Sequence, residues 1–203
     1  IIENVTEEKD KLQYNNGQCW NYSENAYQTI SLNDVQGFVL CVITDDDASK
    51  DQGVFSSNDS VFIKDNTWYA KINNEIISSG IIVYDNSRTY LAFRKNGAKY
   101  DVYISTDAEN WSIVFSGLTL QNCNLGYGMT DTGMLAFNGK IDLAQSYIEE
   151  TKARLYKMNQ KTNITVSTDG ITYENHKYLE TEYAIILINI GYHFNGQIDL
   201  YDS

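Results

Sequence analysis

The sequence predicts an all-β protein, folded as an antiparallel sandwich or barrel, and three observations predict it. The 203 residues include 16 Tyr, 7 Phe and 3 Trp, and aromatic residues, like β-branched ones, favour strands. Short segments of alternating polar and apolar residues follow one another, separated by Asn, Asp, Gly and Ser. Before residue 144, no apolar repeat with the period of a helix continues for three turns.

The elements are expected in the following order along the chain. A charged, solvated lead-in occupies residues 1–14, and residues 6–12 within it favour a short helical turn. Strands are then expected at residues 29–32, 37–44, 53–55, 60–64, 68–72, 75–84, 89–94, 99–105, 111–115 and 134–143. Turns at such short intervals are typical of sandwiches and barrels.

The dipeptide Asn96-Gly97 predicts a β-hairpin, because two-residue hairpin turns need positive φ angles that Asn and Gly adopt readily. If these two residues form the turn, the residue numbers of each cross-strand pair sum to 193. The opposed pairs are then Phe93 with Tyr100, Leu91 with Val102, Thr89 with Ile104 and, on the polar face, Tyr90 with Tyr103. This register places the aliphatic residues on one face of the hairpin and the charges on the other.

A second Asn-Gly pair, Asn138-Gly139, is interpreted differently. A turn there would mix polar and apolar residues on each face, whereas one continuous strand over 134–143 separates them. In that strand one face carries Leu135, Phe137, Gly139, Ile141 and Leu143, and the other carries Asn138, Lys140 and Asp142. Gly139 then marks a bulge or a close approach of neighbouring backbone.

Two signatures occur twice in the chain. I-S-T-D-A-E-N-W at 104–111 is echoed by V-S-T-D-G-I-T-Y at 166–173, and F-N-G-K-I-D-L at 137–143 by F-N-G-Q-I-D-L at 194–200. The second copy is truncated and cannot cover its own apolar face. We therefore expect a lead-in over 1–14, a sandwich over 15–150, and a C-terminal β appendage over 151–203 that packs on the sandwich or on another chain.

Several motifs of the central region form a known combination. They are N-G-A-K-Y-D-V-Y (96–103), S-T-D-A-E-N-W (105–111), L-G-Y-G (125–128), F-N-G-K-I-D-L (137–143), S-Y-I (146–148) and, more weakly, N-N-G-Q-C-W-N-Y-S (15–23). Over about residues 15–150 the chain resembles the concanavalin A-like, laminin-G-like jelly-roll modules of phage tail and fibre proteins. Ala108 departs from that pattern, which usually has Gly. The resemblance implies a jelly-roll sandwich of viral origin, but this fold does not decide function.

Composition and charge limit the function classes. The net charge of −12 disfavours a nucleic-acid partner and an anionic membrane surface. The longest apolar runs, 37–43 and 184–188, are too short for a membrane span. Neither an initial Met nor a signal peptide opens the chain, which suggests a fragment or a processed product. The three cysteines lack zinc spacing, and Cys41, in an apolar run, is expected to be a buried hydrophobe.

Catalytic chemistry is not indicated. The two histidines, His176 and His193, both lie in the truncated copy, and no nucleophile elbow, zinc motif or phosphate loop occurs. Glycoside hydrolysis needs two placed carboxylates, and Asp142 has no partner glutamate nearby in sequence, so a structural role is expected for it. The acidic loop over 44–51 is interpreted as a solvated turn, with a calcium site as the alternative. We expect no enzyme and no cofactor.

Carbohydrate binding is the sharper hypothesis, because sugars stack on aromatic rings and bond to amides and carboxylates. The candidate ligand-binding residues are Trp68, Tyr69, Tyr84, Asp85, Asn86, Tyr90 and Tyr103. Trp68 and Tyr69 point to opposite faces of a strand, so only one of them can be buried in the core. For Tyr90 and Tyr103 an oligomer contact is an equal alternative, and Trp20 and Trp111 are expected in the core.

These inferences combine into one functional prediction. The chain is expected to be a non-enzymatic phage tail or fibre module that binds a host-surface glycan, located in the virion tail or outside the cell. Its other partners would be virion tail subunits and further copies of itself, with a trimer as the expected form. The alternatives are a structural or protein-docking module of a virion, and a bacterial surface adhesin or carbohydrate-binding module.

Overall fold

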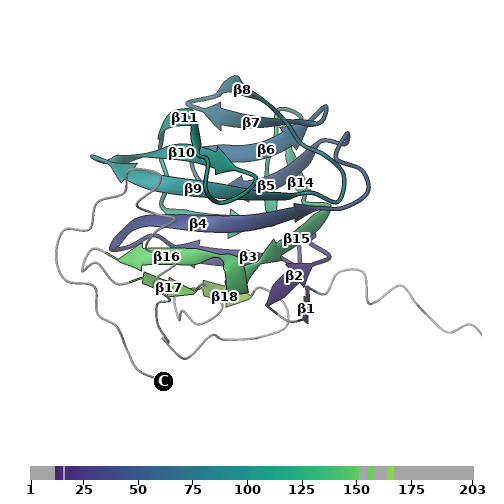
Figure 1. Ribbon diagram of the computed structural model, residues 1–203, viewed down its shortest axis with the longest axis horizontal. Helices are drawn as coiled ribbons and strands as arrows, with labels where there is room; N and C mark the ends of the chain where they lie inside the picture. The colour runs from purple at the N-terminus through teal and green to yellow at the C-terminus, as the bar shows by residue number, and fades with distance from the viewer. Residues whose placement is uncertain (1–11, 16, 151–154, 158–163, 167–203) are drawn as a thin grey trace, which may run out of the picture.

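A computed structural model (Figure 1) describes residues 12–15, 17–150, 155–157 and 164–166 as two antiparallel β-sheets that pack face to face. Every strand pair in both sheets is antiparallel. The predicted all-β antiparallel sandwich is therefore confirmed.

The larger sheet has nine strands in the order β1-β2-β15-β4-β9-β10-β11, with β16 paired to β4 and β17 to β16. The strands are β1 (Gln13–Asn15), β2 (Gln18–Trp20), β4 (Val35–Thr44), β9 (Arg88–Asn96), β10 (Lys99–Ser105), β11 (Ser112–Leu118), β15 (Gly139–Asp142), β16 (Tyr147–Glu150) and β17 (Leu155–Lys157).

The smaller sheet has seven strands in the order β18-β3-β12-β5-β6-β7-β8. They are β3 (Gln28–Ser31), β5 (Gln52–Ser56), β6 (Ser60–Lys64), β7 (Thr67–Ile72), β8 (Glu75–Ile82), β12 (Asn122–Leu125) and β18 (Ile164–Val166). A separate hairpin of β13 (Tyr127–Met129) and β14 (Met134–Ala136) lies against β5.

Nine of the ten expected strands are found near their expected bounds, and the exception is 134–143. β1, β12, β13 and β16 were not anticipated. All four are short, and β12 reads N-C-N-L, which lacks the aromatic and β-branched residues that favour strands. β1 begins at Gln13, two residues before the expected start of the sandwich. The helical turn expected over 6–12 lies outside the described residues except for Leu12, which is not helical.

The second copy of the repeat lies outside the described residues apart from β17 and β18. These two short strands extend one sheet each, since β17 pairs with β16 and β18 with β3. The division of the chain at residue 150 stays a prediction.

The core between the sheets is aromatic at its centre. Phe38 of β4 stacks on Phe93 of β9, with ring centroids 4.3 Å apart and an interplanar angle of 9°. Phe55, from the other sheet, packs against both rings at 5.8 and 4.8 Å. All three rings are fully buried, so this cluster joins the two sheets. Cys41 is buried as expected, and burial raises the pKa of its thiol to about 12.

The hairpin of β9 and β10 is confirmed, but its predicted register is wrong by two residues. The turn is Gly97-Ala98, and the opposed positions sum to 195, so Phe93 faces Val102 and Leu91 faces Ile104. Positive φ occurs at Gly97 (+62°), the first central residue, as a type II′ turn requires. A shift of two residues keeps every side chain on its predicted face, which is why the face pattern could not detect it.

The continuous strand expected over 134–143 is wrong. The chain forms β14, leaves the ladder at Phe137 and Asn138, and enters β15 in a different sheet. Neither does the chain fold back as a hairpin at Gly139, because β14 and β15 do not pair. The predicted close approach is confirmed, since a Cβ at Gly139 would lie 2.3 Å from the carbonyl oxygen of Ile43.

Asp142 has the structural role that was expected of it. Its side chain caps the short 3-10 helix η1 (Leu143–Gln145) by accepting from the backbone N–H groups of Ala144 and Gln145. Ser146 follows, and its hydroxyl accepts from the backbone N–H of Cys41 at 2.9 Å. This contact supplies a partner to β4 at the point where the neighbouring strand changes from β15 to β16.

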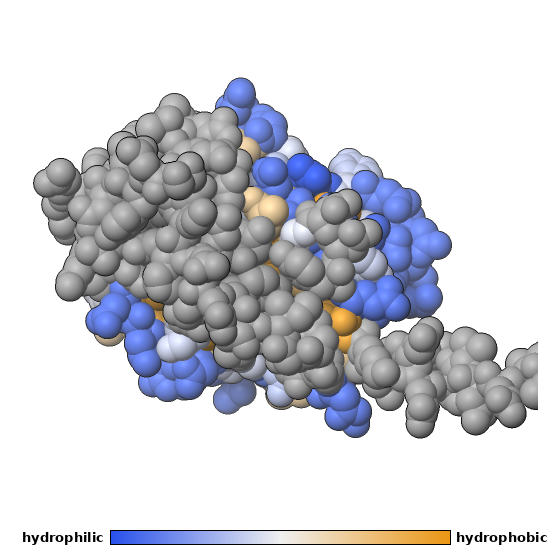
Figure 2. Space-filling model, turned by 90° about the horizontal axis from the view of Figure 1, so that it is seen from below, coloured by the Kyte–Doolittle hydropathy of each residue, from blue (hydrophilic) through white to orange (hydrophobic). Residues whose placement is uncertain are grey.

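The visible described residues on the face seen from below are mostly hydrophilic (Figure 2), which fits the net charge of −12. Among the described residues, no helix has the length and apolar character needed to cross a membrane.

Candidate functional site

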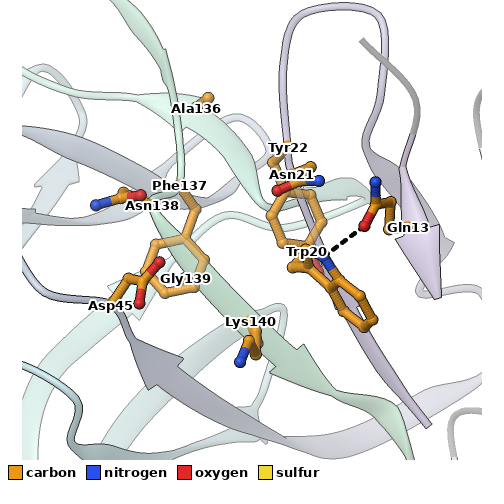
Figure 3. Close-up of a pocket in the computed structure, with 10 residues that line it drawn as sticks. All are labelled: Gln13, Trp20, Asn21, Tyr22, Asp45, Ala136, Phe137, Asn138, Gly139 and Lys140. Carbon is orange, nitrogen blue, oxygen red and sulfur yellow. Dashed lines mark hydrogen bonds between the residues drawn. The ribbon is translucent and has the colours of Figure 1, made fainter. Parts of the chain in front are cut away.

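A pocket of about 480 Å³ opens beside β2 and β15, next to the end of β4 (Figure 3). Its lining comes from four separate parts of the chain. The residues are Gln13, Trp20, Asn21, Tyr22, Asp45, Ala136, Phe137, Asn138, Gly139 and Lys140. A smaller hollow of about 70 Å³ adjoins it and shares Asp45, Gly139 and Lys140.

Strand register places the largest side chains of the pocket. Trp20 lies directly opposite Lys140 in the β2–β15 ladder, so both side chains project from the same face of the sheet. The Lys140 ammonium lies 6.0 Å from the centroid of the Trp20 ring, at the outer limit of a cation–π contact. The indole Nε1 of Trp20 donates to the Gln13 side-chain oxygen at 2.9 Å, which fixes the orientation of the half-buried ring.

The inner wall of the pocket is aromatic and tightly packed. Tyr22 and Phe137 are both buried, and their ring centroids lie 6.2 Å apart. Gly126 allows this packing, because a Cβ there would lie 2.0 Å from the Tyr22 ring. The Tyr22 hydroxyl donates to Gln28 at 3.2 Å. The wall is therefore preformed rather than assembled by a ligand.

The rim of the pocket is polar and its side chains are free. The backbone anchors Asn138, whose N–H donates to the Gln52 side chain at 3.0 Å and whose carbonyl accepts from the Asp45 N–H at 3.2 Å. The side-chain polar atoms of Asn21, Asp45, Asn138 and Lys140 make no hydrogen bond or ion pair with any described residue. The rim thus offers two amides, one carboxylate and one ammonium to a ligand.

The acidic loop over 44–51, beyond the rim, is stabilised by bonds between its own side chains. Asp47 forms an ion pair with Lys50 at 2.6 Å and accepts from the Ser49 hydroxyl, and these bonds lower the pKa of its carboxyl. Within the part of the chain that the structure describes, no three His, Cys, Asp or Glu residues are grouped so that they could hold a metal ion.

Trp68 is wrongly predicted as a stacking surface. Its side chain is 0% exposed and belongs to the core, because β7 directs it inward together with Ala70 and Ile72. Tyr69 points outward as the alternation required, and it is half-buried because its ring stacks on Phe62 at 5.6 Å.

Of the loop residues Tyr84, Asp85 and Asn86, one lies near the pocket. Asn86 lines the smaller hollow beside Asp45 and donates its backbone N–H to the Asp45 carbonyl at 3.1 Å. Asp85 is used structurally, since its carboxylate accepts from the Ala48 N–H at 2.8 Å. Tyr84 is 66% exposed and lines neither cavity.

Tyr90 and Tyr103 do not face each other as the predicted register implied. Tyr90 lies opposite Ser105, and Tyr103 lies opposite Ala92, so the two rings are diagonal neighbours on the outer face of the larger sheet. Both are half-buried, and neither lines the pocket.

The sequence-based prediction for Trp20, the largest side chain of the pocket, was wrong. Trp20 and Trp111 were expected in the core, but both are half-buried and neither belongs to it. One signal could have located Trp20. It follows Cys19 on a short strand, and if the Cys faces inward, the alternation of a strand directs the Trp outward.

Comparisons with known proteins find similar solved structures. No family model and no curated protein matches the chain. Similar solved structures include a heptameric pentraxin from Limulus polyphemus (TM-score 0.38, 12% identity, covering 60% of this chain and 69% of that one). Mouse laminin α1 domains LG4-5 give a TM-score of 0.46 at 10% identity, covering 83% and 46%. A putative carbohydrate-binding protein from Bacteroides ovatus gives 0.40 at 12%, covering 61% and 42%.

These are likenesses of fold alone. The matched region spans less than half of the laminin and Bacteroides chains. The strand pairing itself establishes the antiparallel sandwich.

Proposed function

We propose that the protein is a non-catalytic carbohydrate-binding module whose ligand occupies the pocket beside β2 and β15. One observation carries the proposal. Four polar side chains without a hydrogen-bond or ion-pair partner among the described residues surround a preformed pocket that presents the Trp20 ring. This combination of a ring for the apolar C–H face of a sugar and amides and charges for its hydroxyls suits a sugar better than a flat or purely apolar ligand.

The residues of the pocket would have different roles in binding a sugar. Gln13 holds the Trp20 ring, so the stacking surface is oriented before the ligand arrives and little ordering entropy is lost. Asn21 and Asn138 each supply donors and an acceptor, Asp45 accepts, and Lys140 donates. A hydroxyl-rich ligand satisfies all of these groups, whereas a hydrocarbon would leave them unpaired.

The biological setting is a finer proposal. A phage tail or fibre module that attaches to a host-surface glycan, in the virion or outside the cell, is supported by the sequence resemblance alone. Several copies on one particle would raise avidity without new contacts, which suits a shallow site of weak single affinity.

A glycan array followed by titration tests the proposal. Labelled protein is applied to an array of microbial and animal glycans, and the strongest binder is titrated by isothermal titration calorimetry, a readout that does not depend on the Trp20 fluorophore. Trp20→Ala is expected to weaken binding about tenfold through loss of stacking. Asn138→Ala removes an exposed side chain without partners and is expected to weaken binding while leaving the melting temperature unchanged.

The matched control is Trp111→Ala, which removes a half-buried tryptophan whose indole donates to the carbonyl of Ala108, outside the pocket. Its affinity should equal that of the parent. A folded protein that binds no glycan on the array would contradict the proposal and favour the structural or docking alternative. Binding that is indifferent to both Trp20 and Asn138 would place the sugar elsewhere.

A further inference from the structure

The edge of the smaller sheet is open at β8. This strand pairs with β7 on one side and ends the order of the sheet, so no described strand bonds to its other side. An unpaired edge presents a row of backbone donors and acceptors to another strand. Natural proteins protect such an edge with Lys, Pro, inward charges or a bulge. β8 contains no Lys or Pro, its one charged residue is Glu75 at its start, and its bulge is confined to residues 79–81.

The same strand exposes large apolar side chains. Ile76, Ile77 and Ile82 are 42%, 39% and 57% exposed. β8 lies at the top of the molecule in Figure 1, away from β1, β2 and β15, which carry the proposed sugar pocket. A partner on β8 would therefore leave that pocket open.

The sequence of β8 is nearly palindromic. Residues 76–82 read Ile-Ile-Ser-Ser-Gly-Ile-Ile, with small residues at the centre and two isoleucines at each end. If two copies of β8 pair antiparallel about Ser79, the residue numbers of each pair of opposed residues sum to 158. Ile76 of one copy then faces Ile82 of the other and Ile77 faces Ile81, so isoleucine faces isoleucine at both ends of the contact, while Ser and Gly face each other at its centre.

In β8, the isoleucines that would pair in the dimer lie on the same face of the strand. Ile76 lies opposite Lys71 and Ile82 opposite Thr67, on the outer face of the sheet. Ile77 lies opposite the core residue Ala70, and Ile81 packs against the core. The bulge at residues 79–81 leaves Ile76 and Ile82 on the same face, but it interrupts the regular ladder at the centre of the contact. The N–H groups of Gly80 and Ile81 bond to the hydroxyls of Ser78 and Ser79, so the flanks must form the new ladder.

We propose that two copies of this chain associate through β8, which pairs antiparallel with itself about Ser79 and continues the smaller sheet across the dimer. The contact is isologous, so it closes at two copies. This surface builds a dimer and not the trimer expected from the sequence. An unrelated extended segment could use the open edge, but it would not need the palindromic isoleucines, which favour a second copy of this strand.

A charge-exchange series measured by sedimentation of the full-length chain tests the register. In the double variant Ile76→Lys with Ile82→Lys, lysine faces lysine at both ends of the contact, and dimer affinity should fall about tenfold or more. In Ile76→Lys with Ile82→Glu, each lysine faces a glutamate and the dimer should be retained. Added lysines reduce the net charge of −12, so general repulsion cannot explain a loss in the first variant.

The matched control adds two lysines elsewhere. Asn58→Lys with Thr106→Lys alters exposed turn positions outside β8 and should leave the dimer intact. Melting temperatures near that of the parent verify that each variant is folded.

Disulfide cross-linking provides an independent readout. Ile76→Cys protein mixed with Ile82→Cys protein should form an oxidised heterodimer, because directly opposed residues have Cα atoms about 4.5–5.5 Å apart. Either variant alone should not cross-link. Residues 76 and 82 lie opposite Lys71 and Thr67, four residues apart on β7, so the two cysteines would lie roughly 13 Å apart along the strand. The native cysteines Cys19, Cys41 and Cys123 are buried and do not interfere.

Two results would overturn the proposal. One is a full-length chain that sediments as a monomer at its highest soluble concentration and gives no specific cross-link in the mixture. The other is an oligomer that responds equally to all charge variants, which would place its interface elsewhere. Neither result bears on the sugar pocket, which is tested separately.

Discussion

Ala108 adopts a backbone conformation that its own side chain disfavours. Its φ is +62°, in the left-handed region, within the turn that Ser105 and Asp107 organise. Asp107 accepts from the N–H groups of Glu109 and Asn110 and holds the turn in place, and these bonds keep the pKa of its carboxyl well below its usual range. The strain at Ala108 persists because the surrounding bonds determine the turn.

Ala108→Gly is therefore expected to stabilise the protein by about 0.5–1 kcal/mol, since relief of the left-handed strain exceeds the added entropy of the unfolded chain. Urea denaturation measures the change. The control is Ala98→Gly, at an exposed turn position without positive φ, which should destabilise slightly. A loss of stability in Ala108→Gly would show that the methyl group contributes contacts that outweigh the strain.

Glu149 is a buried carboxyl on β16. It is 1% exposed, its Oε2 has no hydrogen-bond partner among the residues that the structure describes, and burial raises its pKa from 4.5 to about 8. Between these pKa values the folded chain holds a proton that the unfolded chain releases. The contribution of Glu149 to the free energy of unfolding therefore falls as the pH rises from about 4.5 to about 8, by at most about 1.4 kcal/mol per pH unit.

Glu149→Gln removes this titration and retains the shape of the side chain. Its free energy of unfolding relative to the parent should be lowest near pH 4.5 and rise steadily toward pH 8, where the variant is the more stable protein. Denaturation curves of both proteins across that interval provide the measurement. A difference that does not change with pH would contradict the raised pKa.

At the scale of the elements, the junction of β14 and β15 depends on a single glycine. A Cβ at Gly139 would lie 2.3 Å from the Ile43 carbonyl oxygen and 2.5 Å from the Phe137 ring, on the strand that carries Lys140 into the pocket. Gly139→Ala is thus expected to cost about 1–3 kcal/mol through overpacking and to weaken sugar binding. Gly97→Asn is the control, because a Cβ there meets nothing within 4 Å and Asn tolerates positive φ. Thermal melts and the glycan titration measure both effects.

The strands themselves were largely predictable, because alternation and turn residues are local signals. β7 illustrates this, since Trp68, Ala70 and Ile72 point inward in strict alternation. The register of β9 and β10 was not predictable from alternation, because shifts of two residues preserve both faces. Likewise, the break after β14 depends on which sheet each half joins, a long-range choice that residues 134–143 do not encode.

At the scale of the whole molecule, the pocket is a product of strand order. Trp20, Asp45 and Asn138 are distant in sequence and meet because the sheet orders its strands β1-β2-β15-β4. Of the predicted ligand-binding residues, only Asn86 borders the site, through the adjoining hollow. The sequence identified suitable residue types, but their convergence requires the topology, which a single sequence with no pairing signal does not reveal.

The aromatic cluster of Phe38, Phe55 and Phe93 makes the two sheets one cooperative unit. Phe38→Ala leaves a cavity where rings from both sheets meet, and we expect it to cost about 3–5 kcal/mol, as is typical for a buried phenylalanine. For a chain of 203 residues this corresponds to a fall in melting temperature of about 6–20 °C. Ile113→Ala, at an exposed site on β11, should change stability by less than about 0.5 kcal/mol.

Calorimetry and near-UV circular dichroism would distinguish one cooperative unit from two. If the cluster joins the sheets, Phe38→Ala shifts a single transition to lower temperature, and every spectroscopic probe reports the same midpoint. Two separated transitions would instead mean that each sheet retains its own stability without the shared cluster. In that case the pocket, whose lining comes from the larger sheet and from the segment around β14, would lose its ligand at a temperature that differs from the unfolding of β5 to β8.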